Sequence, residues 1–185
     1  GAQIDQYTCS DGAIFRNNQT CLAIYSEKHD PTQERTAKEI ARFSEKDADR
    51  WLKYWTLWQS DEAQRAQMDM LFNPAEFRIA PEVMNRQIAV FPKLLEAGIV
   101  PDSLLLASSH LRAAKDFWES KELQYCQVRF ALSGAYDISD PGIGQDAIGF
   151  PPSMATIGFA RGGTHQIAHA AHQVLVQGGC QFFTH

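Results

Sequence analysis

Three histidines near the C-terminal end of the chain have the spacing most typical of a chemical site. His165, His169 and His172 follow at intervals of four and three residues, so a helix would place them along one face. A row of imidazoles is a candidate Zn²⁺ site, but this segment has no carboxylate to complete it and no H-E-x-x-H motif. We therefore assign no metal site and interpret the histidines as a polar face, solvated or packed against another domain.

Signatures of other catalytic sites are missing from the sequence. No G-x-S-x-G nucleophile elbow occurs, so no motif favours a self-contained hydrolase. The glycine cluster at 142–149 departs from the G-x-G-x-x-G spacing and follows an Asp-Pro loop, so we interpret it as a loop and not as a nucleotide site. The four cysteines form no C-x-x-C pair. We expect free, mostly buried thiols, with a Cys9–Cys21 bridge across a hairpin as the alternative.

Composition and charge narrow the class of protein. The chain has 185 residues, of which 44% are hydrophobic, as expected for one globular domain with its own core. Its formal charge of −5 and the lack of a basic run argue against a nucleic-acid partner. No apolar stretch approaches the roughly 20 residues that span a bilayer. We expect a cytoplasmic protein, with contact to a membrane surface as an open alternative.

The elements that would position a site begin and end with strands. Residues 4–8, 13–16 and 21–25 are short runs separated by turn residues at 10–12 and 17–19, which predicts a strand meander. An apolar run from Cys180 follows two glycines and predicts a strand that contributes to the same sheet. Because this last strand would be cut short at the final residue, we expect the chain to be a piece of a larger protein.

Helices are expected through the rest of the chain. Asp30-Pro31 with Gln33 has the chemistry of a helix start, and Ser44 starts a second helix. Thr164 is the expected N-cap of the last helix. The expected helical ranges are 31–42, 45–71, 81–97 with an interruption at Pro92, 111–118, 121–132, 150–159 and 164–177.

The expected fold class is therefore α+β and predominantly helical, with a helical cap lobe and a small antiparallel or mixed sheet. We expect one domain over 1–185. It comprises a strand meander over 1–29, a helical lobe over 30–159, and a Gly-Gly turn, helix and strand over 160–185.

An aromatic stripe marks the second helix. Trp51, Tyr54, Trp55 and Trp58 are three and four residues apart, which places them on one helical face. Such a stripe most often belongs to a core, and the alternative is the wall of an apolar ligand channel or a membrane-contacting surface.

Four segments, in order along the chain, resemble one enzyme family. They are D-P-T-Q-E-R-T-A-K-E-I-A-R-F-S-E-K-D-A at 30–48, F-W-E-S-K-E-L at 117–123, S-D-P-G at 139–142, and the turn, Gly-Gly, helix, Gly-Gly, strand arrangement of 159–183. Together they are similar to the middle of FAD-dependent oxidoreductases of the phytoene desaturase-like branch of the amine oxidase superfamily. In that family, helices like these cap an apolar cavity above the substrate domain's sheet.

The resemblance implies a flavoprotein of which this chain holds only the substrate side. The family's flavin site begins with G-x-G-x-x-G after a first strand, and this sequence has no such fingerprint. The C-terminal flavin segment of the family is also missing. We therefore expect no FAD on this chain, no catalytic acid or base in it, and no activity from it in isolation, since the cofactor performs the redox chemistry.

The resemblance also points to substrate-binding residues. The turn after Gly-Gly lines the family's substrate cavity, which implies that Arg161, Gly163 and Gln166 contact substrate and that Phe159 forms an apolar wall. Trp55 and Trp58 are added as channel-lining aromatics. The alternative for the turn is a glycine pair needed only for close packing.

Two functions follow as expectations. The first is the substrate-binding region of an FAD-dependent oxidoreductase that acts on C–C bonds of an apolar, isoprenoid- or carotenoid-like substrate. Its partners would be that small molecule and the FAD-binding domain, supplied in cis or in trans. The alternative is a stand-alone helical protein that binds an apolar ligand or a partner chain without catalysis. Either way, a bare apolar face would favour a homodimer or larger species.

Overall fold

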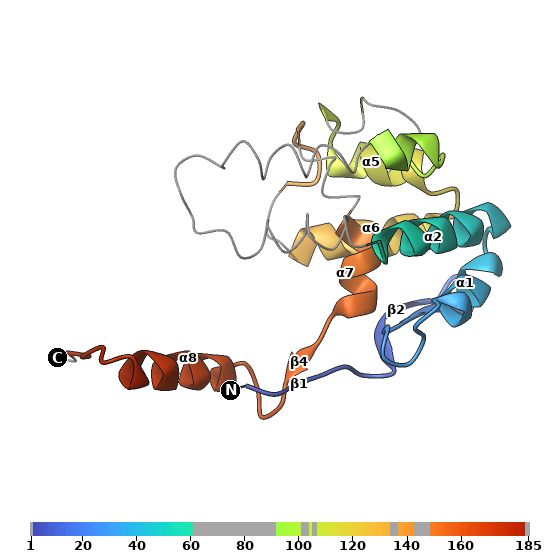
Figure 1. Cartoon of the computed structure of the whole chain (residues 1–185). Coiled ribbons are helices and arrows are strands. Elements are labelled where there is room, and N and C mark those ends of the chain that lie inside the picture. The colour runs from blue at the N-terminus through green and yellow to red at the C-terminus, as the bar shows by residue number, and fades with distance from the viewer. Residues whose placement is uncertain are drawn as a thin grey trace.

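The structure is a computed structural model that describes residues 2–60, 92–100, 104, 107–133, 137–142 and 149–183. Over these ranges the fold is α+β and predominantly helical, as predicted, with two-stranded antiparallel sheets (Figure 1). The elements are β1 (Ile4–Asp5), β2 (Cys9–Phe15), β3 (Thr20–Tyr25), α1 (Glu34–Ala41), α2 (Glu45–Trp58), α5 (His110–Phe117), α6 (Lys121–Ser133), α7 (Phe150–Thr156), β4 (Phe159–Ala160) and α8 (His165–Gln177).

β2 and β3 form an antiparallel hairpin that closes at the predicted turn over 17–19. The turn predicted at 10–12 is wrong, because these residues lie within β2, next to a β-bulge. Gly12 is required in this strand, since a Cβ atom there would lie 2.9 Å from the carbonyl oxygen of Leu22. The glycine that suggested a turn instead permits a close approach of two backbones.

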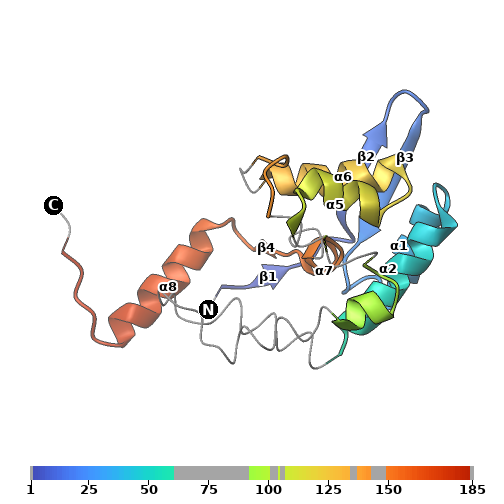
Figure 2. The ribbon, with the colours of Figure 1, turned by 90° about the horizontal axis from the view of Figure 1, so that it is seen from above.

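β1 pairs with β4 and is not part of the hairpin. This pairing requires Gly158, because a Cβ atom there would lie 2.5 Å from Cγ2 of Ile4. The predicted C-terminal strand is wrong, since residues 180–183 form no strand. β4, which was predicted to be the end of a helix, lies beside β1, and α8 then leads the chain away from the hairpin (Figures 1 and 2).

α1 is capped by Asp30, as predicted, but it begins later than predicted. The buried carboxylate of Asp30 accepts hydrogen bonds from the backbone N–H groups of Arg35 (3.2 Å) and Thr36 (2.8 Å) and from the Thr36 hydroxyl (3.0 Å). Pro31 lies in a turn before the helix, and Gln33 is the N-cap residue. The carboxylate of Asp30 therefore binds the first turn of α1, although residues 31–33 lie between them in the sequence.

α2 begins at the predicted N-cap, where the Ser44 hydroxyl accepts a hydrogen bond from the N–H of Asp47 (3.1 Å). The aromatic stripe of this helix belongs mainly to the core. Trp51, Tyr54 and Trp55 are each at most 3% exposed. Burial also raises the pKa of the Tyr54 hydroxyl far above its ordinary value.

α5 and α6 meet at the predicted junction, and one carboxylate of α2 holds it. Buried Asp47 accepts hydrogen bonds from the backbone N–H groups of Glu119 (2.9 Å) and Ser120 (2.8 Å). Lys46 forms an ion pair with Glu119 at 2.5 Å. The segments 43–48 and 117–123, which are far apart in the sequence, are therefore joined in space.

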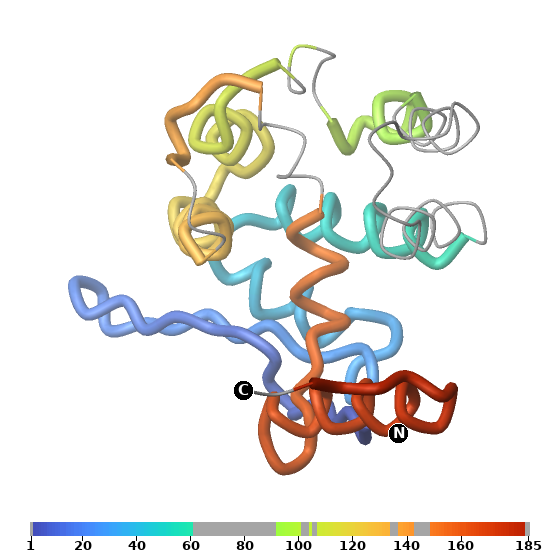
Figure 3. The backbone as a smooth tube through the Cα atoms, turned by 90° about the vertical axis from the view of Figure 1, so that its left-hand side faces the viewer, coloured from blue at the N-terminus to red at the C-terminus, as the bar shows by residue number. Residues whose placement is uncertain are grey.

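The core lies where the hairpin, α1, α2, α6 and α7 converge. α7 contacts α2 and both strands of the hairpin, and it runs through the middle of the fold (Figure 3). The largest fully buried side chains are Trp51, Trp118, Phe117, Phe150, Leu22, Ile24, Ile40, Ile99 and Leu123.

α8 stands apart from this core and buries none of its side chains (Figures 1 and 2). The helix follows Thr164 as predicted, although the Thr164 hydroxyl makes no capping hydrogen bond. It ends at Gly178, and Gly179 has a φ of 86°, which is the left-handed cap expected for this glycine pair. The exposed large apolar residues of this region are Ile167, Val174, Leu175, Val176, Phe182 and Phe183.

Other helix predictions are tested only in part. α2 ends at Trp58, and its predicted continuation over 61–71 lies outside the described residues, as do 72–91. Residues 92–96 are helical and the helix ends before Gly98, as predicted. No helix in the described ranges has both the length and the apolar character needed to cross a membrane.

Candidate functional site

Arg161, the central residue of the predicted site, follows β4 and binds β1. Its guanidinium donates two hydrogen bonds to the carboxylate of Asp5, at 2.8 and 3.1 Å. Its backbone N–H donates to the carbonyl oxygen of Gln3 at 2.9 Å, which extends the pairing of β1 with β4. The hydrogen bond from Arg161 holds the pKa of Asp5 below its ordinary value, and the same contact raises the pKa of Arg161.

The Gly-Gly turn that follows is a backbone requirement. Gly162 and Gly163 have φ values of 84° and 92°, a region that other residues enter only with strain. A Cβ atom on Gly162 would lie 3.2 Å from Cγ of Gln166, so the Gln166 side chain lies over the turn. Gly163 has open space at the same position. The turn sets the direction of α8, and Gln166 covers one of its two glycines.

Phe159, which was predicted to form an apolar wall, makes a small exposed aromatic cluster with Tyr7, a residue that follows β1 in the sequence. Their ring centroids are 5.0 Å apart. Both rings are large exposed hydrophobic groups. The pair offers an apolar surface beside the ribbon formed by β1 and β4.

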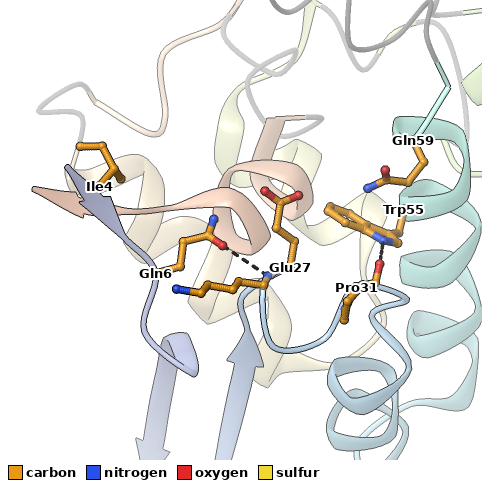
Figure 4. Close-up of a pocket in the computed structure, with 7 residues that line it drawn as sticks. Ile4, Gln6, Glu27, Pro31, Trp55 and Gln59 are labelled. Carbon is orange, nitrogen blue, oxygen red and sulfur yellow. Dashed lines mark hydrogen bonds between the residues drawn. The ribbon is translucent and has the colours of Figure 1, made fainter. Parts of the chain in front are cut away.

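A hollow of about 470 Å³ lies on the other side of β1 (Figure 4). Ile4 on β1 and Trp55 on α2 lie at its opposite sides. The indole of Trp55 donates to the carbonyl oxygen of Pro31 at 2.8 Å, which fixes the ring in place. The residues that line the hollow are Ile4, Gln6, Glu27, Lys28, Pro31, Trp55 and Gln59.

The lining combines an aromatic wall with polar and charged groups. Gln6 is held at the hollow by two hydrogen bonds: its side-chain oxygen accepts one from the backbone N–H of Lys28 (3.3 Å), and its amide donates one to the carbonyl oxygen of Thr156 (3.0 Å). Glu27 and Lys28 contribute one charge of each sign. None of the lining residues is a serine, cysteine or histidine, so the hollow supplies no side-chain nucleophile of these types.

β1 connects the two groups of predicted site residues. Asp5 binds Arg161, whereas Ile4 and Gln6, its neighbours in sequence, line the hollow with Trp55. Alternate residues of a strand point to opposite sides, which explains this division.

The predicted site is only partly assembled in one place. Phe159, Arg161, Gly163 and Gln166 belong to the ribbon and turn, and none of them lines the hollow. Trp58 is partly buried against the core and does not line the hollow either. Of the six predicted residues, Trp55 alone does so.

Sequence reasoning missed the polar lining residues. Glu27 and Lys28 follow β3 after one intervening residue, Ser26, and Gln59 is the C-cap residue of α2. Ile4 and Gln6 are two positions apart, the spacing of residues on one face of a strand. This spacing is the local sequence signal that would have placed these two residues together.

The thiols and histidines are the remaining candidates for metal ligands. Within the described ranges no group of three or more His, Cys, Asp and Glu side chains could hold a metal ion. All four cysteines are free, so the alternative of a Cys9–Cys21 bridge is wrong. Cys126 is buried as expected, and burial raises its pKa to about 12, which keeps it protonated and unreactive. The other three thiols are exposed, contrary to expectation.

No protein-family model, curated protein or solved structure matches this chain.

Proposed function

We propose that this chain is the substrate-side region of an FAD-dependent oxidoreductase that acts on C–C bonds of an apolar substrate. The observation that carries the proposal is α8, a helix of 13 residues that buries no side chain yet has an apolar face. Isolated helices of about this length are marginal in water, so such a face is stabilised by packing against another body. An FAD-binding domain, in cis or in trans, supplies that body.

The contacts between the family-like segments support the same reading. Asp30 caps the helix within the first segment, and Asp47 at its end binds the junction within the second. Trp51 then lies between the two, with its ring centroid 6.2 Å from that of Trp118. The first two of the four family-like segments are therefore joined in space by these contacts.

The described residues do not themselves fit FAD. A dinucleotide site of this class needs a parallel strand pair with a glycine-rich turn leading into a helix. Over the described ranges the strand pairs are antiparallel, and each sheet has two strands. We therefore assign no flavin site to these residues, and the role proposed for the chain is to bind and orient the substrate.

The substrate contacts are proposed on both sides of β1. Phe159 and Tyr7 supply exposed aromatic surface, and Arg161, Gly163 and Gln166 form the turn beside it. Trp55 supplies the aromatic wall of the hollow. We place the protein in the cytoplasm. Contact with a membrane surface is the alternative to test, because apolar substrates partition into lipid.

A second candidate is a stand-alone protein that binds an apolar ligand or a partner chain without catalysis. The hollow next to Trp55 favours this candidate, because it exists within the chain without a second domain.

Flavin titration of the purified chain separates these functions. We expect no change in flavin absorbance or fluorescence with the chain alone, together with a folded circular dichroism spectrum. The gene's reading frame, extended on both sides and expressed whole, should then yield a protein that purifies with bound flavin. Stoichiometric flavin binding by the 185-residue chain alone would overturn the proposal, and an extended product without flavin would favour the second candidate.

A further inference from the structure

One pair of side chains on α8 is left without a role by the proposed function. His165 and His169 are one helical turn apart, and their ring centroids are 4.2 Å from each other. Both residues are exposed. Among the described residues, neither imidazole ring makes a hydrogen bond or an ion pair. Each ring instead contacts the other.

We propose that His165 and His169 form a two-ligand site for a divalent transition-metal ion such as Ni²⁺ or Zn²⁺. Neutral imidazole nitrogen is a favoured ligand for both ions, and two imidazoles four residues apart on a helix approach a metal from the same side. Water completes the coordination, which leaves positions open for a further ligand.

His172 does not belong to this pair, although sequence spacing groups all three histidines. Its ring stacks at 4.5 Å on Phe182, beyond the end of the helix, with an interplanar angle of 39°. This contact directs the ring toward the C-terminal segment. The site therefore has two protein ligands, in accord with the lack of any cluster of three or more metal-ligating groups in the described ranges.

The metal site and the proposed docking face of α8 occupy different sides of the helix. His165 and His169 lie opposite Ile167, Ala171 and Val174 at 3.6 residues per turn. Packing of the apolar face against another domain would leave the imidazoles in solvent. The metal site thus does not depend on the proposed function.

Isothermal titration calorimetry of the full chain with Ni²⁺ at pH 7.5 tests the proposal, after the exposed thiols have been alkylated to remove competing soft ligands. Wild type should bind one equivalent at this site. His165→Gln and His169→Gln should each weaken binding about tenfold or more, because loss of one ligand removes the effective-concentration advantage of the second. The matched variant His172→Gln should change the affinity less than about twofold, because it removes neither of the two proposed ligands.

Nuclear magnetic resonance spectra of the same samples locate the ion directly. Paramagnetic broadening by Ni²⁺ should be strongest for amides of the first two turns of α8, and Zn²⁺ should increase amide protection there, since a ligand that binds the helical form stabilises it. Unchanged affinity in the His165→Gln/His169→Gln double variant, or broadening centred elsewhere in the chain, would overturn the proposal. An equal loss in His172→Gln would also overturn it.

Discussion

At the scale of single residues, buried carboxylates accept hydrogen bonds from backbone N–H groups of distant or irregular segments and so hold these segments in place. Asp30 is the clearest case, because its two oxygens accept three hydrogen bonds from Arg35 and Thr36. We expect Asp30→Ala to lower the free energy of unfolding by about 2 kcal/mol, since two N–H donors of the first helical turn lose their partner.

Urea unfolding followed by tryptophan fluorescence measures this loss. The control is Asp49→Ala, which removes an exposed carboxylate that pairs with Lys53 on α2 and should cost less than about 1 kcal/mol. Equal effects of the two substitutions would contradict a capping role for Asp30.

The Arg161–Asp5 pair makes a separate prediction about pH. The pKa of Asp5 is lowered in the fold, chiefly by the hydrogen bond from Arg161, so the pair stabilises the ribbon above the unfolded pKa of Asp5. This contribution is lost as the pH falls through the lowered, folded-state pKa. We expect Arg161→Gln to raise the pKa of Asp5 toward its ordinary value, in a carboxyl-carbon nuclear magnetic resonance titration.

Arg112→Gln serves as its control, because Arg112 pairs with Asp116 on α5. It should leave the titration of Asp5 unchanged. If Asp5 titrates at the same pH in wild type and in Arg161→Gln, the ion pair does not persist in solution.

At the scale of elements, α6 and α8 are helices of equal length with opposite surroundings. Each has 13 residues, but α6 buries Leu123 completely, whereas Leu175 on α8 is 45% exposed. We expect Leu123→Ala to lower the free energy of unfolding by about 2–5 kcal/mol through lost burial and a cavity. In the monomer, the matched change Leu175→Ala should cost less than about 0.5 kcal/mol, the usual range for surface positions.

Hydrogen exchange should show the same contrast without mutation. In dilute monomeric protein, amides of α2 and α6 should exchange slowly, through global unfolding, and amides of α8 should exchange fast, because no buried contact holds the helix. Strong protection of α8 in dilute monomeric protein would show that it packs on this chain's own core.

At the scale of the whole molecule, the exposed apolar surface of α8 predicts association. Ile167, Val174 and Leu175 lie on a helix that has no Asp, Glu, Lys or Arg, so none of these groups has to be desolvated when a second apolar surface packs on it. We expect dimers or larger species by multi-angle light scattering at micromolar concentration. Val174→Gln combined with Leu175→Gln should shift the distribution toward monomer, and a monodisperse wild-type monomer would contradict the prediction.

Much of the fold could be predicted because its signals are local. Ser44 and the glycines after α8 act within a few residues of their own position, so their effect does not depend on the path of the chain. The fold class and most helix boundaries follow from such signals. Gly12 is an exception, because a glycine in a turn and a glycine that lets two strands approach closely have the same sequence signature.

The tertiary structure alone decided which distant segments meet. The partner of β1 is β4, the partner of Arg161 is Asp5, 156 positions away, and Asp47 binds a junction 72 and 73 residues further along. A two-residue strand carries too little pattern to specify its partner, and an ion pair between distant residues forms only once packing has placed both strands. The hollow beside Trp55 has the same origin, since its walls come from β1, the segment after β3, and α2.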